Sequence, residues 1–230
     1  MSPTAPPQLA DVLRPVRHVL LDFDGPLCSI FSGLPAREVA HRLYASLSVE
    51  QGLPENWQSE PDPLALLRRV GDEQPGLATT ADQALAQLEE EAAHSASPTP
   101  GGESLLKSCA DTGRSVWIVS NNSGSAIRQY LEAQQLHIYV AGVFGRISGE
   151  PSSMKPNPRL LMDAMDTAAA KPTECVFIGD AVRDVQAGDA AGIPTIGYAN
   201  KPGKSMALGQ AGAAVVVDSI QAIADALYVA

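Results

Sequence analysis

Short apolar runs that alternate with helix-like segments limit how this chain can fold more than any other feature. Strand-like runs are expected at residues 16–21, 115–120, 175–179, 194–198 and 214–218, with a weaker one at 139–144. Helical patterns separate most of these runs, at residues 103–112, 125–135, 158–169, 182–191 and 219–227. This alternation predicts an α/β fold in which helices cover both faces of a parallel sheet.

One interval of about 65 residues breaks the alternation. Residues 33–97 contain no strand pattern, and helical periodicity appears at about 35–47, 63–70 and 80–93. The interval closes with the stretch SASPTPGG, whose Ser, Pro and Gly content predicts a linker. We therefore expect three parts: a flexible N-terminal lead (residues 1–15), an α/β core (residues 16–32 and 98–230) and a helical insert (residues 33–97). The insert either covers a site beside the first strand or merely extends the fold.

Composition excludes several classes of protein. The chain has 230 residues, of which 45% are hydrophobic, and a net charge of −10 without a basic stripe, so nucleic-acid binding is not expected. No apolar run reaches the length of a membrane span, and the N-terminus lacks an apolar signal core. Three widely separated cysteines argue against a disulfide framework, and we expect a cytoplasmic protein, monomeric or homodimeric.

Two aspartates follow the first expected strand in the stretch VLLDFDGPLC. Asp22 and Asp24 are one residue apart, so in an extended segment their side chains point to the same side. Ligands bind at the carboxyl ends of strands in open α/β sheets. Because two adjacent carboxylates repel each other, the pair predicts a bound cation, a shared proton, or both.

Three further polar clusters follow strands or precede helices. Ser120 and Asn121 begin a polar turn that could bind an anion or simply cap a helix. Lys155 precedes Pro156 on an extended backbone and could be a fixed positive charge or a surface lysine. Asp180 is expected to cap the helix that carries Asp184; the two acids could hold a cation such as Mg²⁺, or be one cap and one solvated side chain.

The order of these clusters points to a family. Asp22-Phe23-Asp24-Gly25, Ser120, Lys155, and Gly179-Asp180 with Asp184 match the four motifs of the haloacid dehalogenase-like hydrolase superfamily, which the chain resembles from about residue 16 to 225. The insert resembles the helical cap of its phosphoglycolate phosphatase and β-phosphoglucomutase branch. The resemblance implies a Rossmann-like, doubly wound parallel sheet with an inserted α-helical cap domain. Pro26 departs from the family, where Thr or Val is usual, and proline removes a backbone donor from the turn.

The resemblance also implies a function: Mg²⁺-dependent hydrolysis of a small-molecule phosphate monoester. Asp22 would be the nucleophile that forms an aspartyl-phosphate, and Asp24 the general acid and base. Ser120, Asn121 and Lys155 would bind the phosphoryl group. The expected metal-binding residues are Asp22, Asp24, Asp180 and Asp184. The alternatives are a phosphomutase of the β-phosphoglucomutase type and, from another class, a non-catalytic phospho-receiver or binding domain.

The insert offers few cations for substrate selection. Between residues 28 and 97 there is no lysine, and the arginines are Arg37, Arg42, Arg68 and Arg69. Arg37 lies near the linker and Arg68 in a central helix, so these two are the candidates to select a second negative group on the substrate. The alternative is that all four are solvated surface charges.

Overall fold

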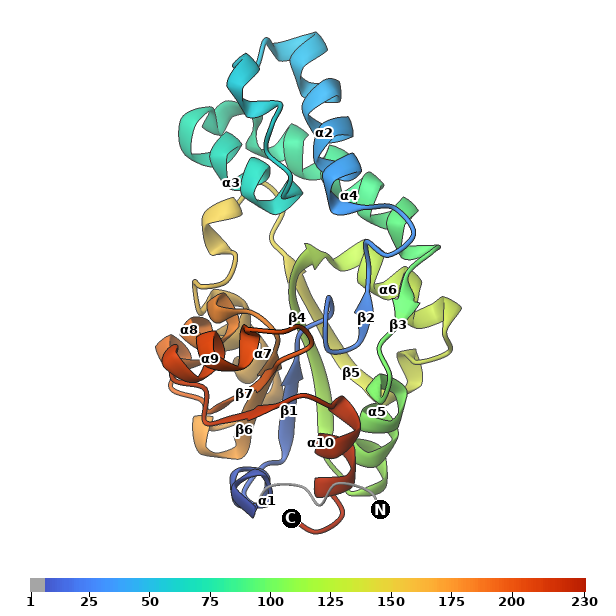
Figure 1. Cartoon of the computed structure of the whole chain (residues 1–230), viewed down its shortest axis with the longest axis vertical. Helices are drawn as coiled ribbons and strands as arrows, with labels where there is room; N and C mark the ends of the chain where they lie inside the picture. The colour runs from blue at the N-terminus through green and yellow to red at the C-terminus, as the bar shows by residue number, and fades with distance from the viewer. Residues whose placement is uncertain (1–6) are drawn as a thin grey trace.

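The computed structural model describes residues 7–230, and its centre is a parallel six-stranded sheet (Figure 1). The strands lie in the spatial order β5 (Val140–Arg146), β4 (Ser115–Ser123), β1 (His18–Leu21), β6 (Cys175–Gly179), β7 (Thr195–Tyr198) and β8 (Val215–Val217). All pairings between neighbours in this sheet are parallel. The predicted α/β class and doubly wound sheet are confirmed.

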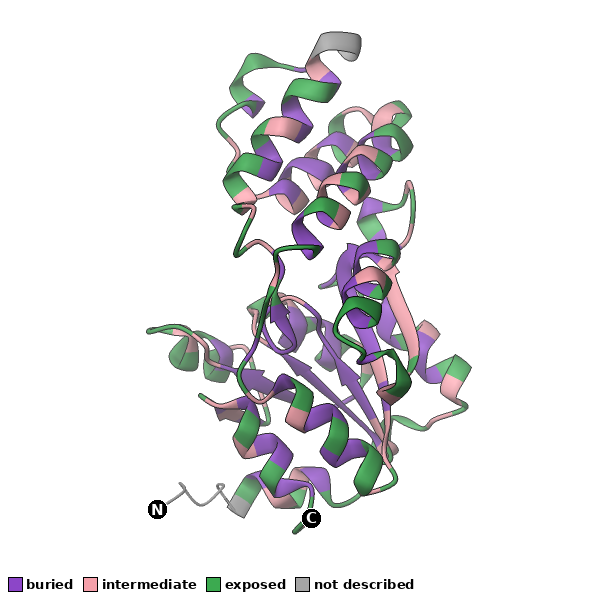
Figure 2. Cartoon of the chain, turned by 90° about the vertical axis from the view of Figure 1, so that its right-hand side faces the viewer, coloured by how far each residue is buried: buried purple, intermediate pink, exposed green. Residues whose placement is uncertain are grey.

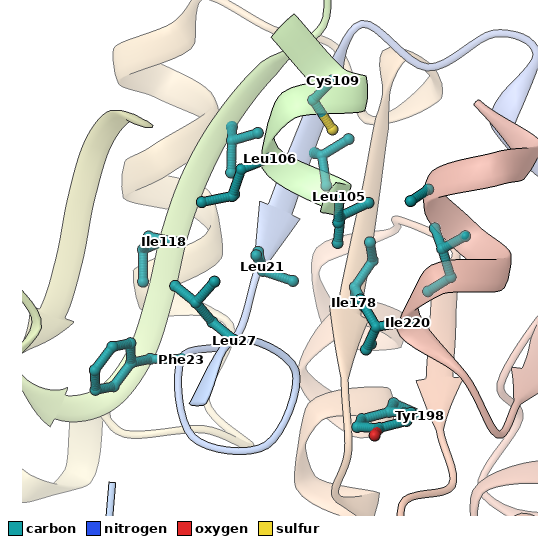
Figure 3. Close-up of a cluster of buried hydrophobic side chains, with 14 of the residues drawn as sticks. Leu21, Phe23, Leu27, Leu105, Leu106, Cys109, Ile118, Ile178, Tyr198 and Ile220 are labelled. Carbon is teal, nitrogen blue, oxygen red and sulfur yellow. The ribbon is translucent and has the colours of Figure 1, made fainter. Parts of the chain in front are cut away.

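Helices cover both faces of the sheet because successive strand residues point to opposite sides. Val19 and Leu21 of β1 face one hydrophobic cluster, whereas Leu20 faces the other. The first cluster, shown in part in Figure 3, includes buried residues from α1 (Pro7–Leu13), α5 (Gly102–Asp111), α6 (Gly124–Ala133) and α10 (Ile220–Ala226). The second includes residues from α7 (Arg159–Ala168) and α8 (Val182–Ala191). The short helix α9 (Lys204–Gln210) packs beside β7 and β8.

The N-terminal lead predicted for residues 1–15 is wrong where the structure describes it. Residues Pro7–Leu13 form α1, and Leu9 and Leu13 are fully buried in the first cluster. Burial of these two leucines, four residues apart on one helix face, explains why the segment is ordered. Residues 1–6 of the predicted lead lie outside the described residues.

The helical insert, residues 33–97, stands above the carboxyl ends of the strands (Figures 1 and 2). Its main helices are α2 (Ala36–Gln51), α3 (Pro63–Glu73) and α4 (Ala78–Ala93). They enclose a further hydrophobic cluster around Trp57 and Leu66, which Met154 of the core joins. The two linkers lie side by side, because β2 (Cys28–Ser29) pairs with β3 (Ser97–Pro98) in a short antiparallel ladder.

Helix α4 belongs to both parts of the molecule. Ala81 and Leu85 pack into the cluster of the insert, whereas Ala92 and Ala93 pack into the first cluster of the core. It packs against α6 of the core as well as against α2 and α3 of the insert. The insert is therefore joined to the core through a continuous helix as well as through its linkers.

Candidate active site

The seven core residues expected to form a site line one cavity of about 230 Å³ at the carboxyl ends of β1, β4 and β6. They are Asp22, Asp24, Ser120, Asn121, Lys155, Asp180 and Asp184. They meet because the segments that carry them all reach the same edge of the parallel sheet, where its strands end. The insert contributes Asp62 and Leu64 to the same cavity.

Lys155 is the central charge of the cavity. Its side chain is 1% exposed, and Nζ lies 2.9 Å from Asp22 Oδ1 and 2.8 Å from Asp184 Oδ1. Burial opposes the positive charge of Lys155, but Asp184 and Asp22 outweigh it and raise the pKa of the lysine. Lys155 is therefore a fixed ammonium between two acids, and the alternative of a surface lysine is excluded.

Asp184 is held by the start of α8. Its Oδ2 accepts hydrogen bonds from the backbone N–H groups of Asp180 at 3.0 Å and Ala181 at 2.9 Å. The prediction that Asp180 caps this helix is wrong: α8 begins at Val182, and Asp184 reaches back from its first turn. The Asp180 side chain instead accepts hydrogen bonds at Oδ2 from Asn200, at 2.9 Å, and from Lys204.

Two glycines allow the acids to approach the backbone. A Cβ on Gly179 would lie 2.5 Å from the Asp184 side chain, and a Cβ on Gly25 would lie 2.5 Å from the Asp180 carboxyl carbon. Gly25 also has a φ of +114°, which favours glycine. Side chains at these positions would push the acids out of the cavity.

The turn after Asp24 forms with proline in it. Leu27 and Cys28 donate their N–H groups to Phe23 O at 3.3 and 3.1 Å, and Thr99 Oγ donates to Gly25 O at 2.6 Å. The Gly25 N–H also closes the turn by donating to Cys28 O at 2.7 Å, so the turn is formed by backbone donors on both sides of Pro26 and needs no N–H group at that position. Asp24 Oδ1 accepts the Ile30 N–H at 3.0 Å, which fixes its carboxyl group at the wall of the cavity.

Asp22 and Asp24, which follow β1, both have raised pKa values. Burial raises the pKa of Asp22 to about 7; Lys155 opposes this shift, and Asp184 adds to it. Burial raises the pKa of Asp24 to about 6, against the effect of the Ile30 hydrogen bond. A carboxyl group with a pKa near 6 can both donate and accept a proton near neutral pH.

The acids also fit a hard divalent cation. One carboxylate oxygen each from Asp22, Asp180 and Asp184 can be chosen so that all lie within 4.8 Å of one another. Oxygen ligands of this kind suit Mg²⁺. The Asp24 side chain is not a member of this cluster. Of the four expected metal-binding residues, three are thus brought together through their side chains.

The turn after β4 differs from expectation in one respect. The strand continues to Ser123, which caps α6, so Ser120 and Asn121 lie within the strand rather than at the helix start. The Asn121 side chain is turned to the backbone of Lys155: Oδ1 accepts its N–H at 2.8 Å, and Nδ2 donates to its carbonyl at 3.2 Å. Ser120 faces the cavity and shares a 3.2 Å hydrogen bond with Asn122.

The two arginines proposed to select substrate lie in different places. Arg37 lines a separate surface pocket on the insert, together with acidic residues. Arg68 donates to the Lys155 carbonyl at 3.0 Å, beside the cavity. Arg183 was not among the predicted site residues, yet it lines the cavity and lies 3.9 Å from Asp62 of the insert. Its place in the sequence, between Asp180 and Asp184, could have indicated that it lies at the site.

Comparisons with known proteins agree with this geometry. A family model described as "Haloacid dehalogenase-like hydrolase" matches residues 19–198. A phosphoglycolate phosphatase of Salmonella choleraesuis is 29% identical over 135 residues, covering 55% of this chain and 52% of that protein. The chain thus spans about half the length of this curated relative.

Solved structures share the fold. A "predicted phosphatase" from Clostridium acetobutylicum superimposes with a TM-score of 0.73 and 21% identity, covering 94% of this chain and 99% of that one. A putative β-phosphoglucomutase from Bacteroides vulgatus gives a TM-score of 0.65 and 20% identity, covering 96% and 97%. At these identities the match establishes the architecture and leaves the reaction open.

Proposed function

Because the chain belongs to the haloacid dehalogenase-like hydrolase family, we propose that it is a phosphatase that hydrolyses a small-molecule phosphate monoester through an aspartyl-phosphate on Asp22. The observation that carries this proposal is the buried ammonium of Lys155, which lies between the carboxylates of Asp22 and Asp184. A positive charge in that place lowers the repulsion between an anionic nucleophile and an anionic phosphate.

The first step is attack by an Asp22 oxygen on phosphorus. The bond from phosphorus to the ester oxygen breaks, and Asp24 gives its proton to that oxygen. Lys155 and Ser120 hold the phosphoryl oxygens, and the main chain of Asn121 lies beside them. In the second step a water molecule attacks phosphorus, the bond to Asp22 breaks, and Asp24 takes a proton from the water.

Mg²⁺ is the cofactor in this proposal. Asp22, Asp180 and Asp184 would hold it, with the Asp24 main chain beside them, and it would supply positive charge that offsets the repulsion among acids and phosphate. The fit rests on the cluster of three carboxylates and on the hydrogen bonds that fix Asp184.

The insert and the substrate are further parts of the proposal. Asp62 and Leu64 bring the insert to the cavity, which supports the interpretation of residues 33–97 as a cap. Among the described residues that line the cavity, Arg183 is the cation that remains besides Lys155, and Arg68 lies near it. We therefore add Arg183 to Arg68 as a candidate selector, whereas the distant pocket of Arg37 gives that residue less support.

A phosphomutase is the second candidate, favoured by the structural similarity to a putative β-phosphoglucomutase. A non-catalytic receiver or binding domain has less support, because the two acids with raised pKa values and the carboxylate cluster are suited to chemistry.

No helix among residues 7–230 has the length and apolar character needed to cross a membrane. The buried, unpaired state of the three cysteines supports the expected cytoplasmic compartment.

The test is phosphate release from a panel of phosphate monoesters, with Mg²⁺ and with EDTA. We expect release from at least one ester, loss of activity in EDTA and recovery on addition of Mg²⁺. A mutase would instead interconvert isomeric sugar phosphates with little free phosphate. Full activity in metal-free buffer would contradict the assigned metal site.

A further inference from the structure

A buried cluster of charges joins the insert to the core beside the candidate active site. Arg146, the last residue of β5, has a side chain that is 1% exposed. Its guanidinium pairs with Asp82 through Nε and with both Glu89 oxygens, at 3.1 Å each, through Nη1 and Nη2. Asp82 and Glu89 are seven residues apart and so share one face of α4.

The same groups hold the strand that carries Ser120. Arg146 Nη1 donates to the Asn121 carbonyl at 2.8 Å. Glu89 Oε1 accepts from Asn122 Nδ2 at 2.9 Å, and Glu89 Oε2 accepts the Ser123 N–H at 2.9 Å. Three consecutive residues of β4 are thus fixed by Arg146 and Glu89.

Asn121 connects these contacts to Lys155 and its two acidic partners. Its side chain makes two hydrogen bonds with the backbone of Lys155, whose Nζ lies between Asp22 and Asp184. Direct contacts therefore run from α4 through Arg146 and Asn121 to Lys155. None of the proposed chemical steps uses Arg146, Glu89 or Asp82.

Burying three charges is costly, and apolar residues of similar volume often serve stability as well or better. Unlike apolar residues, this cluster provides a directional hydrogen bond, from Arg146 to the Asn121 carbonyl. A shift of about 1 Å in a catalytic group costs a large factor in rate. A group that fixes Asn121 can therefore affect the reaction rate without touching the substrate.

We propose that Arg146 is a positioning residue for phosphoryl transfer: held by Glu89 and Asp82, it fixes Asn121, which sets the position of Lys155. The inference rests on the proposed phosphatase function, and it means that the seating of the insert on the core and the geometry of the active site depend on each other.

The test compares Arg146→Lys with a matched control. Arg42 and Glu91 form a similar two-bond pair between α2 and α4, at 2.8 and 2.7 Å, but on the surface of the insert. We expect Arg146→Lys to lower kcat by roughly tenfold or more and to weaken binding of inorganic phosphate measured by calorimetry, whereas Arg42→Lys leaves both within about twofold. All variants are assayed well below their unfolding temperature.

A double-mutant cycle separates positioning from general stability. If Arg146 acts through Asn121, the variant Arg146→Lys/Asn121→Ala loses no more kcat than the worse single variant. Losses that multiply, or a folded Arg146→Lys with wild-type kcat and phosphate affinity, would overturn the proposal. If Arg146→Lys does not fold, Glu89→Gln, which keeps the shape of the side chain, takes its place in the same cycle.

Failure of this inference differs from failure of the proposed function. If the wild-type protein releases phosphate from no ester in the panel, the function itself is wrong. If the wild-type protein is active and the Arg146 and Glu89 variants match it, only the positioning role is wrong.

Discussion

Lys155 and Asp184 illustrate what single residues reveal before a structure is known. Their motifs predicted a shared site, because the carboxyl ends of parallel strands meet at one edge. The side-chain partners could not be predicted. Asn121 turns to the backbone of Lys155, and Asp180 turns to Asn200 and Lys204 rather than capping α8. Such partners lie up to 34 residues away in the chain, and no local pattern encodes them.

Replacing Asp24 tests the two roles assigned to that residue. In Asp24→Asn the nucleophile Asp22 remains, but the base for the second step is lost. With an aryl phosphate, whose leaving group needs little protonation, we expect a burst of about one equivalent of aryl alcohol, followed by turnover slowed by a hundredfold or more. Rapid-quench kinetics measures both phases. A uniformly slow reaction without a burst would contradict this division of roles.

Replacing Arg183 tests substrate selection. Its guanidinium lines the cavity and is only loosely paired with Asp62, at 3.9 Å. For a substrate with a second anionic group, Arg183→Ala should lower kcat/KM roughly tenfold, the scale of one charged hydrogen bond. A small aryl phosphate without that group should be hydrolysed almost normally.

Arg37→Ala is the matched control for this experiment, because Arg37 lies in a different pocket. Equal losses for both substrates in Arg183→Ala would assign Arg183 to the core reaction. No loss for either would exclude it as a selector.

At the scale of elements, the sequence predicted most core strands and helices to within a few residues. The helix spanning residues 182–191 and the strand at residues 175–179 have the predicted bounds. Helix α1 was missed because Pro and Thr in the preceding residues favour an irregular lead, whereas burial of Leu9 and Leu13 against α10 and β8 decides the outcome. The sequence also could not show that α4 packs against both the insert and the core, because its apolar periodicity does not change where one partner gives way to the other.

Helix α1 should contribute measurably to stability. Leu13 is fully buried, so Leu13→Ala removes apolar contacts and leaves a cavity, and we expect the free energy of unfolding to fall by about 2–5 kcal/mol. Ile138→Ala is the control, because that side chain is 69% exposed and should change stability by less than about 0.5 kcal/mol. Urea unfolding measures both. Equal, small effects would mean that α1 is not part of the core.

At the scale of the whole molecule, the site concentrates negative charge at one edge of a sheet. Burial raises the pKa of Asp22 to about 7 and that of Asp24 to about 6, whereas both are near 4 in an unfolded chain. Between these values the folded protein binds more protons than the unfolded protein, so its stability decreases as pH rises. The two buried carboxylates therefore lower the free energy of unfolding at neutral pH, and a bound cation would offset this loss of stability.

This loss of stability should be measurable in the metal-free protein. In EDTA we expect the unfolding temperature to fall by several degrees as pH rises from about 5 to about 7.5. Mg²⁺ should raise it most at the upper end, because the acids are then charged. Asp22→Asn should flatten the dependence. A wild-type unfolding temperature that rises across this range would contradict the sign derived from the raised pKa values.

If phosphoryl transfer passes through Asp22, peptide mapping of the trapped intermediate will find the phosphoryl group on that residue. Asp24→Asn is mixed with an aryl phosphate and Mg²⁺, quenched in acid, digested with a protease active at low pH and analysed by tandem mass spectrometry. We expect one added phosphoryl group on the peptide that contains Asp22, located on that residue, and none in Asp22→Asn/Asp24→Asn. A phosphoryl group on any other residue, or substrate turnover without a phosphorylated peptide, would contradict it.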